Sequence, residues 1–355
     1  IEAYLHVSAK EDGRYLPASF LDKAWELADK EYAEVMPPEK IWEYGVRYAK
    51  EYLWAEEKEY KGFSIGLVPD EDGRWKQRPF GKYEVGWCGQ NASFANSLLV
   101  DYIKSGDKTS LDKALATLDT WTSPVLQYDN GLYVTHYDNI LDSVERPVSD
   151  ACNLGTAAYN FFEAAGLLES CGQTGLVERL RKTALGICDF VKADQQASGV
   201  YGRGWYPDGE CYVREGTVGA FMIAPMIRAY DATSDVSYLE SAKKAFDYYY
   251  GEFERLGYTT AGALDTWCID KESSMPILRS ALMLYDATGD RSYIDKAENV
   301  SYYLSTWLWH YRAGYAPEED AARYGYNTFG ATSVSTQHHH LDVYAVMWVA
   351  EWLKL

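Results

Sequence analysis

The 355-residue sequence predicts an all-α protein, an (α/α)6 barrel in which helical hairpins form a toroid with long loops on one face. Three observations predict this fold class. A helix–turn–helix unit recurs along the chain, the two helices of each unit differ in polarity, and short connections alternate with long ones.

The repeated unit consists of a helix end, a tight turn rich in Gly, Ser and Asp, and the start of a second helix. Its four copies align on Tyr102, Leu168, Tyr230 and Tyr285, which are 66, 62 and 55 residues apart. A fixed supersecondary unit that recurs in this way is typical of repeat architectures, in which neighbouring units bury a shared core.

The helix after each turn is amphipathic, whereas the helix before it is apolar or small on nearly all sides. The first kind is expected on the outside of the toroid and the second kind inside it. Inner helices are predicted near 88–104, 150–169, 216–231, 273–287 and 336–354. Outer helices are predicted near 39–57, 109–122, 174–195, 236–256 and 291–309, with a further one over 20–35.

Long connections are predicted between the hairpins, near 58–87, 123–149, 196–215, 257–272 and 310–335. Strand-like alternation is confined to them, together with Asp-Gly and Asn-Gly turn signals. Long loops in a compact domain usually carry function. We therefore expect a cleft on the loop face, near the N-termini of the inner helices. A linear solenoid is the alternative architecture, and it should show more regular spacing.

Composition and charge exclude several classes of protein. The 34 basic and 53 acidic residues give a net charge of −19, which argues against nucleic-acid and anionic-membrane partners. No apolar run reaches the length of a membrane-spanning helix. Aromatic residues make up 15% of the chain, an excess that suits stacking on sugar rings as well as a large core.

Neither a metal nor a cofactor is predicted. The six cysteines form no Cys-x-x-Cys pair. A helix over 336–354 would place His338 and Asp342 on one face, but two ligands are too few for a metal site. One domain over 1–355 is expected. The first residue is Ile1, which indicates a processed or excised chain. The oligomeric state stays open, and so does the location, which is either the bacterial cytoplasm or secreted/periplasmic.

Carboxylates near the starts of inner helices are the candidate catalytic groups. Asp150 opens one inner helix, Glu215 precedes the next, and Asp265 lies beside Trp267 in the loop before another. Glycosidases use two such groups, one to donate a proton and one to activate water, and the sequence does not give the separation that would set the mechanism. Asp150 also fits the structural role of a helix N-cap.

Aromatic, amide, histidine and arginine side chains of the same loops are the candidate substrate-binding groups. Aromatic rings would form sugar subsites, amides and histidines would bind hydroxyls, and arginines would meet a carboxylate. The candidates are Trp87, Gln90, His136, Arg146, Trp205, Tyr212, Arg214, Trp267, His338 and His339.

Three segments resemble the six-hairpin glycosidase superfamily, and most of all its unsaturated glucuronyl and rhamnogalacturonyl hydrolases. They are SDACNLGTAAYNFFEAA from Ser149, VREGTVGAFMIAPMIRAYDATSD from Val213 and ESSMPILRSALMLYDATGD from Glu272. The likeness covers residues 88–310. It implies that Asp150 protonates an unsaturated uronide and prepares water for its hydration, and that Arg146 or Arg214 meets the uronate.

The function predicted is a glycoside hydrolase that acts on oligosaccharides from a polysaccharide, with uronate-containing sugars among the candidate substrates. Three alternatives stay open on the same toroid. They are a sugar epimerase that uses histidines as acid and base, a polysaccharide lyase, and a non-catalytic glycan-binding domain.

Overall fold

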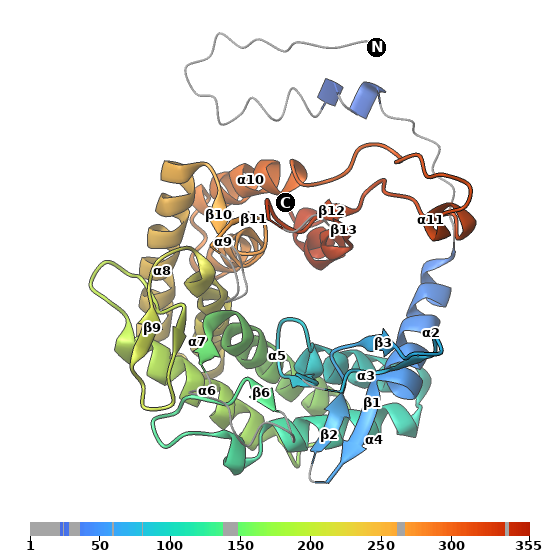
Figure 1. Ribbon diagram of the computed structural model, residues 1–355. Coiled ribbons are helices and arrows are strands. Elements are labelled where there is room, and N and C mark those ends of the chain that lie inside the picture. The colour runs from blue at the N-terminus through green and yellow to red at the C-terminus, as the bar shows by residue number, and fades with distance from the viewer. Residues whose placement is uncertain are drawn as a thin grey trace. The chain divides into compact units, whose positions relative to one another are not determined.

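The structure is a computed structural model that describes residues 22–23, 25–27, 36–58, 60–79, 81–137, 148–260, 267–337 and 341–355. The chain divides into two compact units. Their elements are labelled in Figure 1. The central unit comprises Glu34–Tyr248, and the terminal unit comprises Ile1–Ala33 with Tyr249–Leu355. The expectation of one domain over 1–355 stays a prediction.

Helices dominate the central unit, and two hairpins in it follow the predicted repeat. Helix α3 packs on α4, and α5 packs on α6. The α-helices are α2 (Pro38–Tyr48), α3 (Asn91–Ser105), α4 (Lys108–Trp121), α5 (Ala151–Ser170), α6 (Val177–Asp194) and α7 (Ile223–Thr233). Helix α8 (Val236–Leu256) begins in this unit and continues past its last residue, Tyr248. Shorter elements are the π-helix η2 (Ala49–Leu53) and the 3-10 helices η3 (Pro124–Leu126) and η4 (Val218–Met222).

The turn between α3 and α4 shows how the sequence makes a hairpin. Gly106 ends α3 in the left-handed conformation, with φ of 74°, which glycine adopts without steric cost. Asp107 then accepts a 2.9 Å hydrogen bond from the Thr109 amide and caps α4. The repeated Gly/Asp turn is therefore a C-cap followed directly by an N-cap.

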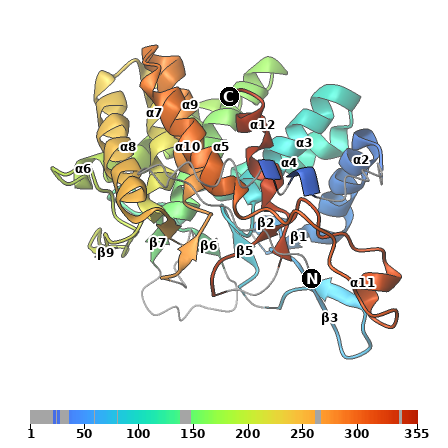
Figure 2. The ribbon, with the colours of Figure 1, turned by 90° about the horizontal axis from the view of Figure 1, so that it is seen from above.

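Short antiparallel strand pairs form the long connections of the central unit. The strands are β1 (Trp54–Glu57), β2 (Tyr60–Phe63), β3 (Leu67–Pro69), β4 (Trp75–Gln77), β5 (Tyr83–Glu84), β6 (His136–Tyr137), β7 (Ser149–Asp150), β8 (Gly204–Trp205) and β9 (Cys211–Val213). Figure 2 shows them gathered at one end of the helices of this unit, which confirms long loops on one face.

The terminal unit contains another hairpin, formed by α9 (Ser274–Thr288) and α10 (Ser292–Ser305). Gly289 ends α9 with φ of 72°, as Gly106 ends α3. The remaining elements are β10 (Thr259–Thr260), β11 (Ile269–Asp270), α11 (Asp320–Arg323), β12 (Thr332–Ser333), β13 (Leu341–Asp342), η5 (Tyr344–Trp348) and α12 (Val349–Trp352). None of the described helices is both long and apolar enough to span a membrane.

The predicted inner helix over 336–354 is wrong. Asp342 instead pairs with Thr332 in a two-stranded sheet and accepts a 2.9 Å hydrogen bond from the Tyr344 amide, so regular α-helix begins only at Val349. The predicted helix over 39–57 also ends early, at Leu53, and β1 starts at the next residue, Trp54. The helix expected over 20–35 lies largely outside the described residues.

Candidate active site

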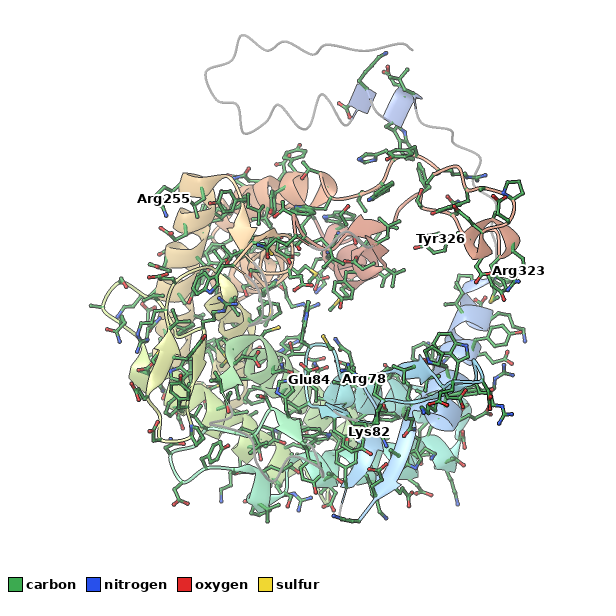
Figure 3. The ribbon with its side chains drawn as sticks, in the orientation of Figure 1. Arg78, Lys82, Glu84, Arg255, Arg323 and Tyr326 are labelled. Carbon is green, nitrogen blue, oxygen red and sulfur yellow. The ribbon has the colours of Figure 1, made fainter. Side chains whose placement is uncertain are left out.

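Two buried carboxylates lie together on the loop face of the central unit. Asp150 ends β7 and caps α5, where Oδ1 accepts a 2.8 Å hydrogen bond from the Asn153 amide. Glu84 lies on β5 (Figure 3). Their exposed fractions are 3% and 4%. Buried charges are rarely tolerated without partners, so such a pair is a candidate site.

The side-chain amide of Asn153 joins the two carboxylates. Nδ2 donates to Glu84 Oε1 over 2.6 Å and to Asp150 Oδ2 over 3.0 Å. These two oxygens therefore lie no farther apart than the sum of the two distances, 5.6 Å. Asn153 Oδ1 accepts the Gly86 and Trp87 amides, each over 3.0 Å. The two backbone donors orient the amide so that its nitrogen faces the carboxylates.

Two glycines allow the chain to wrap closely around this amide. A Cβ atom at Gly86 would lie 2.8 Å from Asn153 Oδ1, and one at Gly89 would lie 2.1 Å from the Glu84 carbonyl oxygen. The Gly89 amide in turn donates a 2.9 Å hydrogen bond to Glu84 Oε2. The segment GWCGQ therefore needs glycine at both positions for close approach of its backbone.

His136 lies at the exposed side of the pair. Strand β6 pairs with β5 so that His136 is opposite Glu84, and Nε2 lies 3.5 Å from Glu84 Oε1. The His136 side chain is 51% exposed, against 6% for Glu84. Lys82, two residues before Glu84, forms its ion pair with Glu57 (Figure 3). His136 thus connects the buried carboxylates with solvent.

Burial raises the pKa of the Glu84 carboxyl above its ordinary value. A positive charge on His136 and the hydrogen bonds from Asn153 and Gly89 act in the opposite direction, while the nearby charge of Asp150 raises the pKa further. Glu84 therefore keeps its proton to higher pH than an exposed glutamate. A pair of carboxyl groups in unlike environments is a common arrangement for acid and base roles.

Other predicted residues lie apart from this cluster or serve as supports. Trp205 is fully buried and donates a 2.7 Å hydrogen bond to Asp194 at the end of α6. Arg214 binds the same carboxylate over 2.7 Å. Both side chains thus anchor the loop to an outer helix. Tyr212 and Glu215 are exposed.

Trp87 and Gln90 lie in the segment that wraps the carboxylate pair. Trp87 is 4% exposed and packs edge-on against Phe221, with ring centroids 5.1 Å apart. Gln90 precedes α3 in the left-handed conformation, with φ of 49°. The Trp87 ring is buried and the Gln90 side chain is only partly exposed. That these two residues contact a substrate stays a prediction, and its support is that they lie in the segment next to Glu84.

Trp267 is 51% exposed in the terminal unit. The remaining candidates lie outside the described residues: Arg146, Asp265, His338 and His339. The described residues contain no group of three or more His, Cys, Asp or Glu side chains arranged to hold a metal ion.

The terminal unit has its own buried ionic group at the start of α9. Lys271 is fully buried and donates to Asp342 Oδ2 over 2.7 Å and to the Val334 carbonyl over 3.1 Å. Asp270 and Glu272, on either side of it, are 2% and 5% exposed. Asp270 Oδ1 accepts the Glu272 amide over 2.7 Å.

Glu84 and Asn153 were not among the site residues predicted from sequence. Glu84 is seven residues before α3, so its place at a helix start is hidden by the intervening loop. Asn153 lies inside an apolar helix and carries neither an acidic nor a basic group, so no local pattern marks it as a functional residue. The available signal was the pair of glycines in GWCGQ, which begins two residues after Glu84.

Comparison with known proteins identifies the fold. No family model matches the chain, and no curated protein matches its sequence. Among solved structures, a GH76 α-mannanase from Bacteroides thetaiotaomicron is similar over 96% of this chain and 86% of its own, at 14% identity and a TM-score of 0.57.

Two sugar-isomerising enzymes are also similar. A D-mannose isomerase matches over 85% of this chain and 79% of its own, at 15% identity and a TM-score of 0.55. A cellobiose 2-epimerase from Spirochaeta thermophila matches over 83% and 73%, at 14% identity and a TM-score of 0.53. These likenesses confirm the (α/α)6 barrel fold. At such identities they concern the fold alone.

Proposed function

We propose that the chain is a glycoside hydrolase that acts on oligosaccharides derived from a polysaccharide. The observation that carries the proposal is the buried Glu84–Asp150 pair, joined by the amide of Asn153. Two carboxyl groups at such a separation are the usual machinery for cleaving a glycosidic bond.

Glu84 is assigned the role of general acid. Its raised pKa keeps a proton available for the departing oxygen of the glycosidic bond. Glu84 regains this proton in the second step, when it acts as general base on the water that hydrolyses the glycosyl-enzyme. His136, 3.5 Å from Glu84 Oε1 and half exposed, lies on the solvent side of Glu84. Asp265 and Glu215, the partners expected for Asp150, give way to Glu84 in this proposal.

Asp150 is assigned the role of the anionic partner. The N-terminus of α5 and the Asn153 amide stabilise negative charge on it. The two carboxylate oxygens are at most 5.6 Å apart. That limit is below the roughly 6.5–9.5 Å of inverting enzymes and allows the roughly 5–5.5 Å of retaining enzymes. The proposal therefore includes direct attack by Asp150 and retention of configuration.

The neighbours in fold support a carbohydrate substrate. A mannanase, a mannose isomerase and a cellobiose epimerase each act on sugars, as their names state. The resemblance of the segment from Ser149 to unsaturated glucuronyl hydrolases adds uronides to the candidate substrates. In a uronide hydrolase of that type Asp150 would instead be the proton donor.

One observation favours a second candidate, a sugar isomerase or epimerase. His136 Nε2 lies 3.5 Å from Glu84 Oε1, and such a pair can move a proton from and to a sugar carbon. A hydrolase and an isomerase would both use the site around Glu84, so the two candidate functions are distinguished by the products that they form.

The test is to incubate the protein with neutral mannan and glucan oligosaccharides, cellobiose, mannose and unsaturated uronides. The products are then separated by chromatography and their masses are determined by mass spectrometry. Cleavage with gain of water supports the hydrolase, and removal of only the unsaturated sugar supports the narrower class. An altered sugar of unchanged mass supports the isomerase. Cleavage without water, or no product from any substrate, would overturn the proposal.

A further inference from the structure

Strand β6 presents its two residues to opposite sides. His136 faces Glu84, whereas Tyr137 belongs to a group of stacked rings on the other side. The Tyr137 and Tyr60 rings are nearly parallel, at 10°, with centroids 5.4 Å apart. Tyr83, which is opposite Tyr137 in the strand pair, lies 6.3 Å from it.

A cavity of about 290 Å³ opens beside these rings, outside the carboxylate cluster. Its apolar wall includes Tyr137, Leu126 and Val125. Val125 is 85% exposed and marks the rim, whereas Leu126 is buried and marks the interior. None of Glu84, Asp150 and Asn153 lines it. The volume is at the small end of the ~300–1,000 Å³ usual for ligand sites, so it suits one sugar ring.

The polar wall of the cavity is balanced in charge. Arg179 forms an ion pair with Asp119, and its Nε donates to Thr122 over 3.0 Å. Thr120 Oγ1 accepts the Lys61 amide over 3.2 Å, which leaves its hydroxyl proton for a ligand. The wall thus offers donors and acceptors without net charge, and an uncharged ligand with several hydroxyls matches it.

We propose that this cavity binds a neutral monosaccharide as a second site, separate from the carboxylate cluster, and that its occupancy acts on His136 through β6. A pyranose would place its C–H face on the ring of Tyr137 and its hydroxyls on the Asp119–Arg179 wall. Because His136 and Tyr137 are adjacent in a two-residue strand, fixing the ring of one restricts the backbone of the other.

Binding can be measured without turnover, so this proposal stands or falls separately from the proposed hydrolase. Saturation-transfer NMR and calorimetry with D-mannose, D-glucose and D-galactose give the affinity, and D-glucuronate serves as a charged comparison. The wild type is expected to bind a neutral sugar in the millimolar range and to bind glucuronate more weakly. Absence of binding by all three neutral sugars would overturn the proposal.

Two variants locate the site. Val125→Trp fills the cavity from its exposed rim, and Tyr137→Ala removes the ring platform. Both should weaken the affinity at least tenfold. Val236→Trp, at an exposed valine outside the cavity, is the matched control and should bind as the wild type does. Glu84→Gln should retain the affinity within twofold. Loss in Glu84→Gln with retention in both cavity variants would assign all binding to the carboxylate cluster and overturn the proposal.

The proposed effect of sugar binding in the cavity on His136 can be measured separately from the affinity. The ring-proton chemical shift of His136, assigned with His136→Gln, should move when the wild type is saturated with the sugar at fixed pH. The shift should stay unchanged in Val125→Trp. A sugar that binds the wild type without moving the His136 signal would overturn the coupling.

Discussion

At the scale of single residues, Asn153 organises the candidate site. Its amide donates to Glu84 and Asp150 and accepts from two backbone amides, so all its buried polar atoms are used. Fully satisfied polar networks of this kind are rigid, whereas the loss of one member leaves several groups unpaired.

Asn153→Ala should therefore lower the free energy of unfolding by roughly 2–5 kcal/mol, because the Gly86 and Trp87 amides lose their buried acceptor. Urea denaturation measures the loss. The matched control is Asn160→Ala in the same helix, where the half-buried amide contacts Thr156 and Asn96 and should cost only about 1 kcal/mol. Equal losses in the two variants would contradict this account of Asn153.

Glu84 should also make the stability depend on pH. Its pKa is raised from 4.5 in the folded state, so the folded chain holds the proton more tightly than the unfolded chain. This contribution is fully present below about pH 4.5 and is lost as pH rises through the raised pKa of Glu84.

We therefore expect the wild type to lose stability relative to Glu84→Gln between pH 4.5 and neutrality, as measured by urea denaturation. A wild type that gains stability over Glu84→Gln as pH rises would contradict the raised pKa.

Residue roles could be predicted from sequence only where the signal is local. Asp150 stands directly before an apolar helix, and a helix start favours an acidic cap at that position. Glu84 is positioned in the site by the pairing of β5 with β6, in which it lies opposite His136, 52 residues later in the chain. Trp205 and Arg214 are residue types that are common in sugar-binding sites. In the structure both side chains bind Asp194, and no local sequence pattern indicates this contact.

At the scale of elements, α5 depends on close contact with the segment that precedes α7. A Cβ atom at Gly155 would lie 2.3 Å from the Phe221 carbonyl oxygen in η4. Nothing lies within 4 Å of the corresponding point at Gly166, eleven residues further along the same helix.

Gly155→Ala should thus destabilise the protein by at least ~1–3 kcal/mol, because backbone must move to admit the methyl group. Gly166→Ala should stabilise it by about 0.5–1 kcal/mol, since alanine is the better helix former where space is open. In thermal melts, the melting temperature should fall below that of the wild type for Gly155→Ala and rise above it for Gly166→Ala. A Gly155→Ala variant as stable as Gly166→Ala would show that the contact is not tight.

Most helices could be predicted because their apolar periodicity and Gly/Asp turns are local features. The exception, residues 336–354, has an apolar pattern that fits a helix equally well. There the pairing of Thr332 with Asp342 and the buried Lys271–Asp342 ion pair hold the start of the segment in a strand. Contacts between segments 71 residues apart thus override the local pattern.

At the scale of the whole molecule, the repeat of helical hairpins was sufficient to predict the barrel fold. The substrate was not predictable in the same way, because this fold serves hydrolysis and isomerisation alike in its neighbours. The net charge of −19 helps to distinguish between an anionic and a neutral substrate, because it repels an anionic sugar and leaves a neutral sugar unaffected.

If a uronide is a substrate, its KM should fall several-fold as ionic strength rises from about 0.02 to about 0.2 M, because salt screens the repulsion. The KM of a neutral oligosaccharide should stay constant over the same range, and initial rates measure both. A uronide KM that rises with salt would instead indicate a local cationic site that outweighs the net charge.

The most direct test of the central claim is the kcat of wild type, Glu84→Gln and Asp150→Asn on the substrate that the glycan panel identifies. The account predicts that each substitution lowers kcat by roughly 10²–10⁴-fold while the circular dichroism spectrum stays unchanged. Exposed Glu178→Gln should retain the wild-type rate. A folded Glu84→Gln or Asp150→Asn variant with the wild-type kcat would contradict the assignment of catalysis to this pair.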